Sequence, residues 1–172
     1  MSIELHRTFW PVGHGAFYTE EFCLGDARKF TVVYDCGGKG IKKSIDDFLR
    51  RALENDETKP IIDLLFISHF HHDHINGLTY LFKKSRVKRI VIPQLSKKML
   101  IEAFVYNEIY GGALTSDTRK IILQFADFRN SIDIPITEII ANTENQDINI
   151  KNIFPVIHRI CNKQAHLIYI HK

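Results

Sequence analysis

The chain has 172 residues, of which 45% are hydrophobic and 25% are charged, a balance typical of a soluble globular protein with a buried core. No apolar stretch reaches the roughly 18 residues that a membrane span requires, and the N-terminus lacks the layout of a secretory signal. Three scattered cysteines form neither a disulfide framework nor a paired zinc motif: Cys23, Cys36 and Cys161. These features exclude membrane and disulfide-stapled secreted classes and favour a cytoplasmic protein.

The first half of the chain predicts an α/β arrangement. Three segments rich in Val, Thr, Phe and Tyr are separated by glycine turns and are expected to be β-strands: 3–10, 15–24 and 29–35. Apolar residues at helical spacing predict a helix over 41–53. The apolar run 61–67 is too continuous for a strand with one wet face, so we expect a central strand that is covered on both sides.

The second half continues this pattern. A helix over 75–83 and a strand over 87–92, ended by Pro93, complete a strand–helix–strand unit, which implies a right-handed crossover. Further predictions are helices over 96–110 and 116–128, a polar loop over 142–152 and a last strand over 166–171. Aromatic residues of the two helices are expected to belong to the core: Phe104, Tyr106, Tyr110, Phe125 and Phe128.

Four of the nine histidines fall within six residues, directly after the apolar run 61–67. In an extended segment His69 and His71 point the same way, because side chains alternate with period two. Asp73 and His74 follow beyond a turn and can face a second ion beside the first. Imidazole suits zinc and similar metals, and a carboxylate adds a harder oxygen ligand. The pattern therefore predicts a two-metal site at a strand end, against the alternative of an exposed histidine-rich loop without metal.

This H-x-H-x-D-H string resembles the signature of the metallo-β-lactamase superfamily. The resemblance carries over His69, His71, Asp73 and His74 as metal ligands, with Asp73 also orienting the nucleophile. It implies zinc, with manganese or iron as substitutes, and it implies that the variable position His72 points away from the metals. Relatives cleave several kinds of bond on this scaffold, so the string defines no substrate.

Two upstream segments extend the resemblance. The strand-and-turn segment 32–38 is similar to the family motif whose acidic residue, here Asp35, supports the loop that carries the metal ligands. That loop is here residues 69–74 and is called the metal loop below. The segment 11–18 is similar to the V-G-Q-G opening of a nucleic-acid-associated branch, with His14 in place of the glutamine. We expect Asp35 or the Gly13–His14 turn to lie behind the metal ligands, and we expect a phosphodiester or nucleotide substrate.

The resemblance is weaker in the second half. Two-metal members need three later ligands, and the only later histidines are His158, His166 and His171, with His158 as a candidate for the first of them. The resemblance therefore implies an αββα sandwich with a mixed sheet and flanking helices, present as its N-terminal half and part of the second. We expect residues 1–172 to form a single, incomplete domain, whether as a fragment or as a naturally shortened chain.

Two functions follow from this sequence. The first is a metal-dependent hydrolase that uses a metal-activated water. The alternative is a catalytically incomplete half that serves as a structural or partner-binding module, with a homodimer or a partner chain covering an exposed sheet face. A basic cluster could contact phosphate, although a solvated surface is the favoured interpretation: Lys83, Lys84, Arg86, Lys88, Arg89, Lys97 and Lys98.

Overall fold

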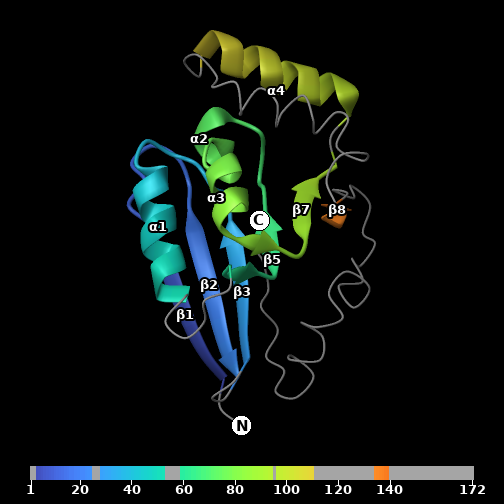
Figure 1. The fold of residues 1–172 in the computed structure, drawn as a ribbon. Helices are drawn as coiled ribbons and strands as arrows, with labels where there is room; N and C mark the ends of the chain where they lie inside the picture. Colours follow the sequence, from blue (N-terminus) through green and yellow to red (C-terminus); the bar gives the residue numbers. More distant parts are fainter. Residues whose placement is uncertain (1–2, 25–27, 53–58, 95, 111–133, 140–172) are drawn as a thin grey trace. The chain divides into compact units, whose positions relative to one another are not determined.

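Six strands form a mixed sheet in the order β1-β2-β3-β5-β7-β8 (Figure 1). The computed structural model describes residues 3–24, 28–52, 59–94, 96–110 and 134–139, all within the first of two units of the chain, Met1–Ile140. The strands are β1 (Ile3–Phe9), β2 (Tyr18–Leu24), β3 (Arg28–Tyr34), β5 (Leu64–Phe66), β7 (Ile90–Pro93) and β8 (Ile136–Ile139). β1, β2 and β3 pair antiparallel, and the pairs from β3 to β8 are parallel. The three predicted N-terminal strands are confirmed, whereas β8 was not predicted.

The predicted strand over 61–67 is central but is not continuous. Its second part, β5, lies between β3 and β7, as expected. Its first part, β4 (Ile61–Ile62), pairs with β6 (Arg86–Val87) in a separate two-stranded sheet. The break falls at Asp63, whose N–H donates to the Thr31 carbonyl at 2.9 Å while its carboxylate accepts the Thr31 N–H at 2.9 Å. These hydrogen bonds to β3 replace regular strand pairing. The prediction of one uninterrupted strand over 61–67 was therefore wrong.

Four helices lie in the described part of the chain: α1 (Ile41–Ala52), α2 (His72–Ile75), α3 (Leu78–Lys84) and α4 (Lys97–Tyr110). The predicted helices over 41–53 and 96–110 are confirmed to within one residue. The helix predicted over 75–83 begins only at Leu78, because the Gly77 N–H donates to the Cys36 carbonyl at 2.8 Å. The last residues of the histidine cluster form the separate short helix α2.

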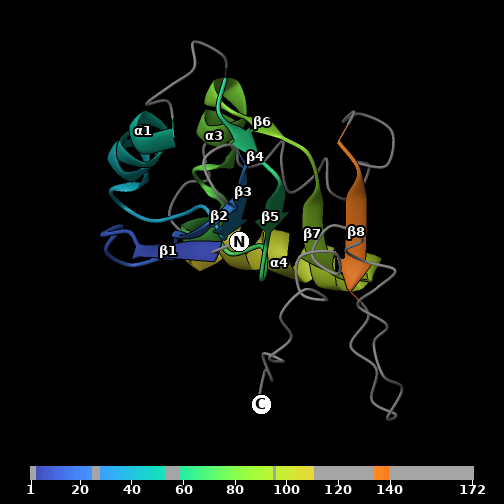
Figure 2. The same ribbon diagram turned by 90° about the horizontal axis from the view of Figure 1, so that it is seen from below.

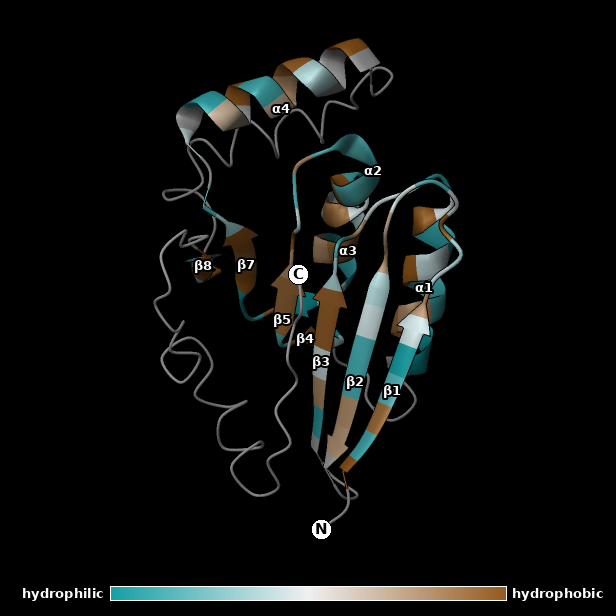
Figure 3. Cartoon of the chain, turned by 180° about the vertical axis from the view of Figure 1, so that it is seen from behind, coloured by the Kyte–Doolittle hydropathy of each residue, from teal (hydrophilic) through white to brown (hydrophobic). Residues whose placement is uncertain are grey.

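The core lies between the sheet and the helices α1 and α3 (Figure 2). Buried side chains on the helices include Ile45, Phe48 and Leu81, and they meet buried strand residues such as Val33 and Leu65. The central strands β3, β5 and β7 are mostly apolar, whereas β1 and β2 also carry hydrophilic stretches (Figure 3). β5 and β7 are parallel and are joined through α3, which confirms the predicted strand–helix–strand unit.

Several predictions fall outside the described residues: the helix over 116–128, the loop over 142–152, the strand over 166–171 and the three late histidines. The prediction of a single, incomplete domain stays a prediction. Cys36 is fully buried, and burial raises the pKa of its thiol, as expected for a structural cysteine. No helix among the described residues combines the length and apolar character needed to cross a membrane.

Three loops contact one another directly through their backbones beside α2: the turn between β1 and β2, the turn after β3 and the histidine loop. The Cys36 N–H donates to the His74 carbonyl at 2.8 Å, and the Gly37 N–H donates to the Ala16 carbonyl at 2.9 Å. A Cβ on Gly37 would lie 2.2 Å from the Asp73 carbonyl oxygen. The histidine loop can approach this closely only because position 37 carries no side chain.

We therefore expect Gly37→Ala to lower the free energy of unfolding by about 1–3 kcal/mol, because the added methyl group overpacks a backbone contact. Urea denaturation followed by circular dichroism measures the change. Gly40→Ala is the matched control: its Cβ would meet nothing closer than the Pro11 carbonyl at 3.6 Å. Gly40→Ala should lower the free energy of unfolding by no more than about 1 kcal/mol. Equal losses for the two variants would contradict the close packing of Gly37.

Candidate metal centre

The histidine cluster lies at the carboxyl end of β5, between the sheet and α4 (Figure 1). The ring centroids of His69 and His74 are 3.9 Å apart, and those of His69 and His71 are 4.6 Å apart. Three of the four predicted ligand side chains are therefore neighbours at the edge where parallel α/β sheets bind their ligands. His69 and His71 lie beside each other, as their spacing predicts.

A single buried carboxylate, Asp35, organises this loop from behind. It is 7% exposed and follows β3 directly. Its Oδ1 accepts the Ser68 N–H at 2.7 Å, and its Oδ2 accepts the Ser68 hydroxyl at 2.6 Å. Oδ2 also lies 2.8 Å from His74 Nδ1. The structure thus places Asp35 behind the predicted ligands, as the sequence indicated.

These bonds determine which imidazole nitrogen remains available on two histidines. A carboxylate only accepts, so His74 Nδ1 carries a proton, and in the neutral ring Nε2 is the nitrogen with a lone pair. The Ser68 hydroxyl gives its proton to Asp35, so it can only accept from His69 Nδ1, 2.9 Å away. His69 Nε2 is then also unprotonated. Orientation of a ligand histidine by a carboxylate is common in protein metal sites.

The pKa of His69 is lowered from its ordinary value. Burial is the largest cause, followed by the neighbouring His74 and His71. All three effects favour the neutral ring of His69, because a charged imidazolium loses solvation on burial and is disfavoured beside other titratable imidazoles. The neutral ring is the form that binds a metal ion.

Asp73 faces the opposite side of the cluster. Its Oδ2 lies 3.7 Å from His74 Nε2 and 3.3 Å from His14 Nε2, and its side chain is 29% exposed. The Gly13–His14 turn therefore lies against the metal loop, as expected. His72 Nε2 instead lies 3.1 Å from Asn76 Nδ2, and Asn76 Oδ1 accepts the Gly38 N–H. The prediction that His72 points away from the metals stays a prediction, and its ring contacts Asn76 here.

One contact of the loop was not predicted. Tyr106 on α4 stacks on His71, with ring centroids 4.5 Å apart and planes 19° apart. Tyr106 is 47% exposed, so its predicted place in the core is wrong, whereas Phe104 packs against the core as expected. Residues two apart on a helix point about 200° from each other, so these two rings cannot share one face. The spacing of Phe104 and Tyr106 in the sequence could therefore have shown that only one of the two rings faces the core.

The donor types fit a divalent metal of the zinc class, since neutral imidazoles and one carboxylate gather at one strand end. Within the described ranges, no three His, Cys, Asp or Glu side chains are already grouped in an arrangement that would hold an ion. Binding therefore requires side chains of the cluster to reorient on a backbone that already brings them together. The assignment of His69, His71, Asp73 and His74 as ligands stays a prediction.

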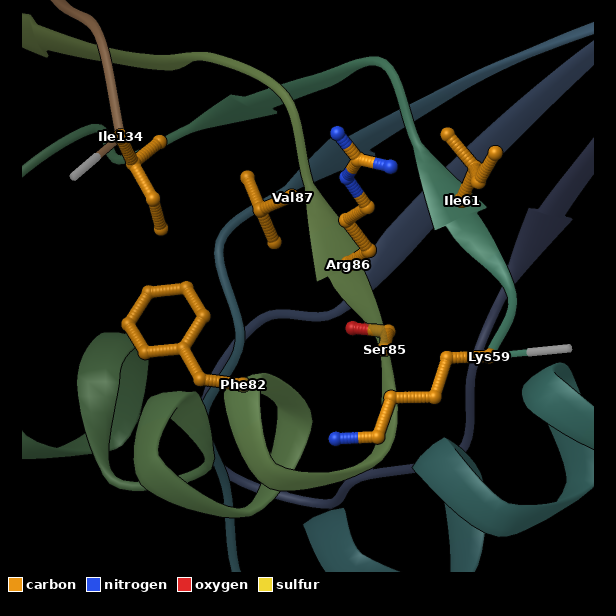
Figure 4. Close-up of a pocket in the computed structure, with 7 residues that line it drawn as sticks. All are labelled: Lys59, Ile61, Phe82, Ser85, Arg86, Val87 and Ile134. Carbon is orange, nitrogen blue, oxygen red and sulfur yellow. The ribbon is translucent and has the colours of Figure 1, made fainter.

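A hollow of about 760 Å³ lies at the other end of the parallel strands (Figure 4). It is lined by Lys59, Ile61, Phe82, Ser85, Arg86, Val87 and Ile134. None of the clustered histidines reaches it. The metal loop, and not this hollow, carries the chemistry that the sequence predicts.

The basic cluster is partly neutralised. Lys84 pairs with Asp46 at 2.8 Å, and Lys88 pairs with Asp63 at 2.7 Å. Lys98 lies 3.7 Å from Glu102. These pairs agree with the favoured interpretation of a solvated surface over that of a phosphate-binding patch.

Comparison with known families supports the assignment of the fold. The profile of the metallo-beta-lactamase superfamily matches residues 25–155, which include the histidine cluster and Asp35. The chain therefore belongs to the metallo-beta-lactamase superfamily, whose members are generally hydrolytic metalloenzymes. The mixed sheet with its helices agrees with this fold. No curated protein matches the chain.

We expect Asp35→Asn to weaken zinc binding by about 10- to 100-fold, as loss of a ligand's orienting partner typically does. An asparagine cannot accept protons from Ser68 and His74 on both of its side-chain atoms. Zinc titration against a competing chelator measures the affinity. The control Asp46→Asn changes a carboxylate that pairs with Tyr80 and Lys84, away from the loop. An affinity for Asp35→Asn within twofold of the control would contradict the role of Asp35.

The Tyr106 contact predicts a smaller effect. Tyr106→Leu should weaken zinc binding by roughly two- to tenfold, the range expected for loss of one aromatic pair. Tyr106→Phe should retain the affinity, because the ring remains. Val105→Ala, at an exposed neighbouring position of α4, is the control. Equal affinities for all three variants would show that the stack does not orient His71.

Proposed function

We propose that the protein is a cytoplasmic, zinc-dependent hydrolase that cleaves phosphodiester or nucleotide substrates. Superfamily membership supports metal-dependent hydrolysis. The observation that carries the proposal is the series of hydrogen bonds from His69 through Ser68 and Asp35 to His74, which occupies Nδ1 of both histidines and leaves Nε2 as the nitrogen that can bind a metal in the neutral rings. A surface loop of histidines without a metal has no need of a buried carboxylate that fixes two rings.

In this proposal His69 and His71 hold a first ion, and Asp73 and His74 hold a second, with manganese or iron able to replace zinc. The bound metal supplies a water whose pKa is lowered toward neutrality, and thus a hydroxide nucleophile. Asp35 keeps the rings of His69 and His74 oriented. Asp73, at the exposed side, has a carboxylate that can accept a hydrogen bond from the attacking water and orient it.

The phosphodiester part of the proposal is supported by the segment 11–18, which resembles the opening of the nucleic-acid-associated branch. A second support is a row of aromatic rings that crosses the sheet at the same end as the metal loop: Phe9, Tyr18, Tyr34 and Phe66. Their successive ring centroids are 4.4, 5.4 and 4.9 Å apart. The outermost ring, Phe9, is 82% exposed and offers a face on which a nucleobase can stack.

A catalytically incomplete, partner-binding module is the second candidate. The observation that favours it is the apolar surface of α4, where large side chains are exposed: Met99, Ile101, Val105, Tyr106 and Ile109. Exposed apolar side chains gathered on one helix favour association with a second copy or a partner chain.

The double substitution of His69 and His71 by alanine distinguishes the two candidates. We expect it to remove zinc, measured by elemental analysis of the purified protein, and to abolish zinc-dependent hydrolysis of bis(p-nitrophenyl) phosphate. The change should leave the fold intact by circular dichroism, because both rings lie outside the core. His6→Ala, on exposed β1, is the control.

Zinc content that survives the double substitution would reject the ligand assignment. A wild-type protein that binds zinc through this loop but does not hydrolyse the diester would favour the partner-binding module. In that case light scattering of the wild type should show self-association.

A further inference from the structure

A fifth histidine lies at the metal loop, contributed by a different part of the chain. His14 stands between Gly13 and Gly15, whose φ angles are +70° and +131°. Such positive values are readily adopted only by glycine, so the two residues fix a sharp turn between β1 and β2. The turn presents the side chain of His14, which is 95% exposed, beside Asp73.

The backbone of this turn is tied to the metal loop. The Ala16 N–H donates to the Asp73 carbonyl at 3.3 Å. A Cβ on Gly15 would lie 2.4 Å from the same carbonyl oxygen, so the two chains are in direct contact. The position of His14 relative to Asp73 therefore depends on packed backbone, although the imidazole itself is free to rotate.

The distances around Asp73 match those within a zinc site. Ligands at about 2.0–2.2 Å in a tetrahedron are separated from one another by roughly 3.4 Å. Asp73 Oδ2 lies 3.3 Å from His14 Nε2 and 3.7 Å from His74 Nε2. Each imidazole nitrogen is thus at about the separation of a neighbouring ligand from the carboxylate oxygen, although the three described side chains do not form a closed ligand group.

A simple ion pair does not explain this arrangement as well. An ion pair with a side chain as exposed as His14 gains little in water. His74 has its Nδ1 on Asp35, so in the neutral ring the unprotonated Nε2 faces the Asp73 carboxylate, and two acceptors that face each other make no hydrogen bond. One carboxylate oxygen and two imidazole nitrogens are donor types that bind a cation of the zinc class.

We propose that His14 is the third protein ligand of the ion held by Asp73 and His74. The inference rests on the proposed metal binding and adds to it a ligand from before the matched residues 25–155. With His14 the second ion has three protein ligands, and the fourth position remains for water, as in catalytic zinc sites. The exposed ring of His14 would have to rotate to complete this group.

The test compares His14→Gln with His6→Gln, which makes the same change at an exposed histidine on β1 that pairs with Glu4. Zinc is titrated into each protein against a competing chelator, and cobalt is titrated separately. The absorption of bound cobalt reports coordination number. Circular dichroism verifies that both variants are folded.

We expect the wild type and His6→Gln to bind two zinc ions per chain. His14→Gln should retain the first ion and bind the second at least about tenfold more weakly, since even an outer partner of a ligand contributes that much. The cobalt spectrum of the second site should change in His14→Gln alone.

An unchanged second affinity and cobalt spectrum in His14→Gln would overturn the inference. The proposed function would still stand if substitution of His69 and His71 removes zinc. A wild type that binds only one zinc ion would also overturn the inference about His14, but it would leave the hydrolase proposal intact. A wild type that binds no zinc would refute both the inference and the hydrolase proposal.

Discussion

The buried carboxylate of Asp35 is the constraint on which the metal loop depends. A carboxylate that is only 7% exposed is costly to bury unless hydrogen bonds compensate for the lost water. Asp35 accepts two hydrogen bonds from Ser68 and one from His74. The backbone at Asp35 has φ of 53°, so the chain turns sharply as β3 ends. Aspartate tolerates this region better than most side chains do. The same residue therefore ends a central strand, turns the chain and sets the tautomers of two histidines.

Precision in this site comes from backbone packing more than from side chains. The carbonyl of Asp73 meets two glycines, Gly15 and Gly37, from two different loops. Main-chain hydrogen bonds then join the histidine loop to the turn after β3. These contacts leave the ligand side chains at the surface of a rigid frame, where a metal can gather them without disturbing the sheet. The absence of a closed ligand group in the described residues is compatible with such a frame.

The sequence predicts those parts of the fold that depend on local pattern. Strand and helix periods, and the histidine cluster after a buried run, place β1, β2, β3, α1 and the metal loop correctly. The break at Asp63 was missed because it depends on Thr31, 32 positions away, which no local pattern reveals. The stack of Tyr106 on His71 was missed for the same reason, although helical geometry already separated that ring from Phe104. The ligand set itself stays a prediction.

We expect the class of reaction and its selectivity to depend on different parts of this molecule. The superfamily profile covers the histidine cluster and Asp35, and relatives with this core act on varied substrates. Two side chains border this cluster from other parts of the chain: His14, which lies before the matched residues, and Tyr106 on α4, which stacks on His71. Side chains that border a rigid site contact whatever part of the substrate extends from the metals. Substrate choice should therefore follow from these two side chains, and the H-x-H-x-D-H string should determine only that hydrolysis occurs.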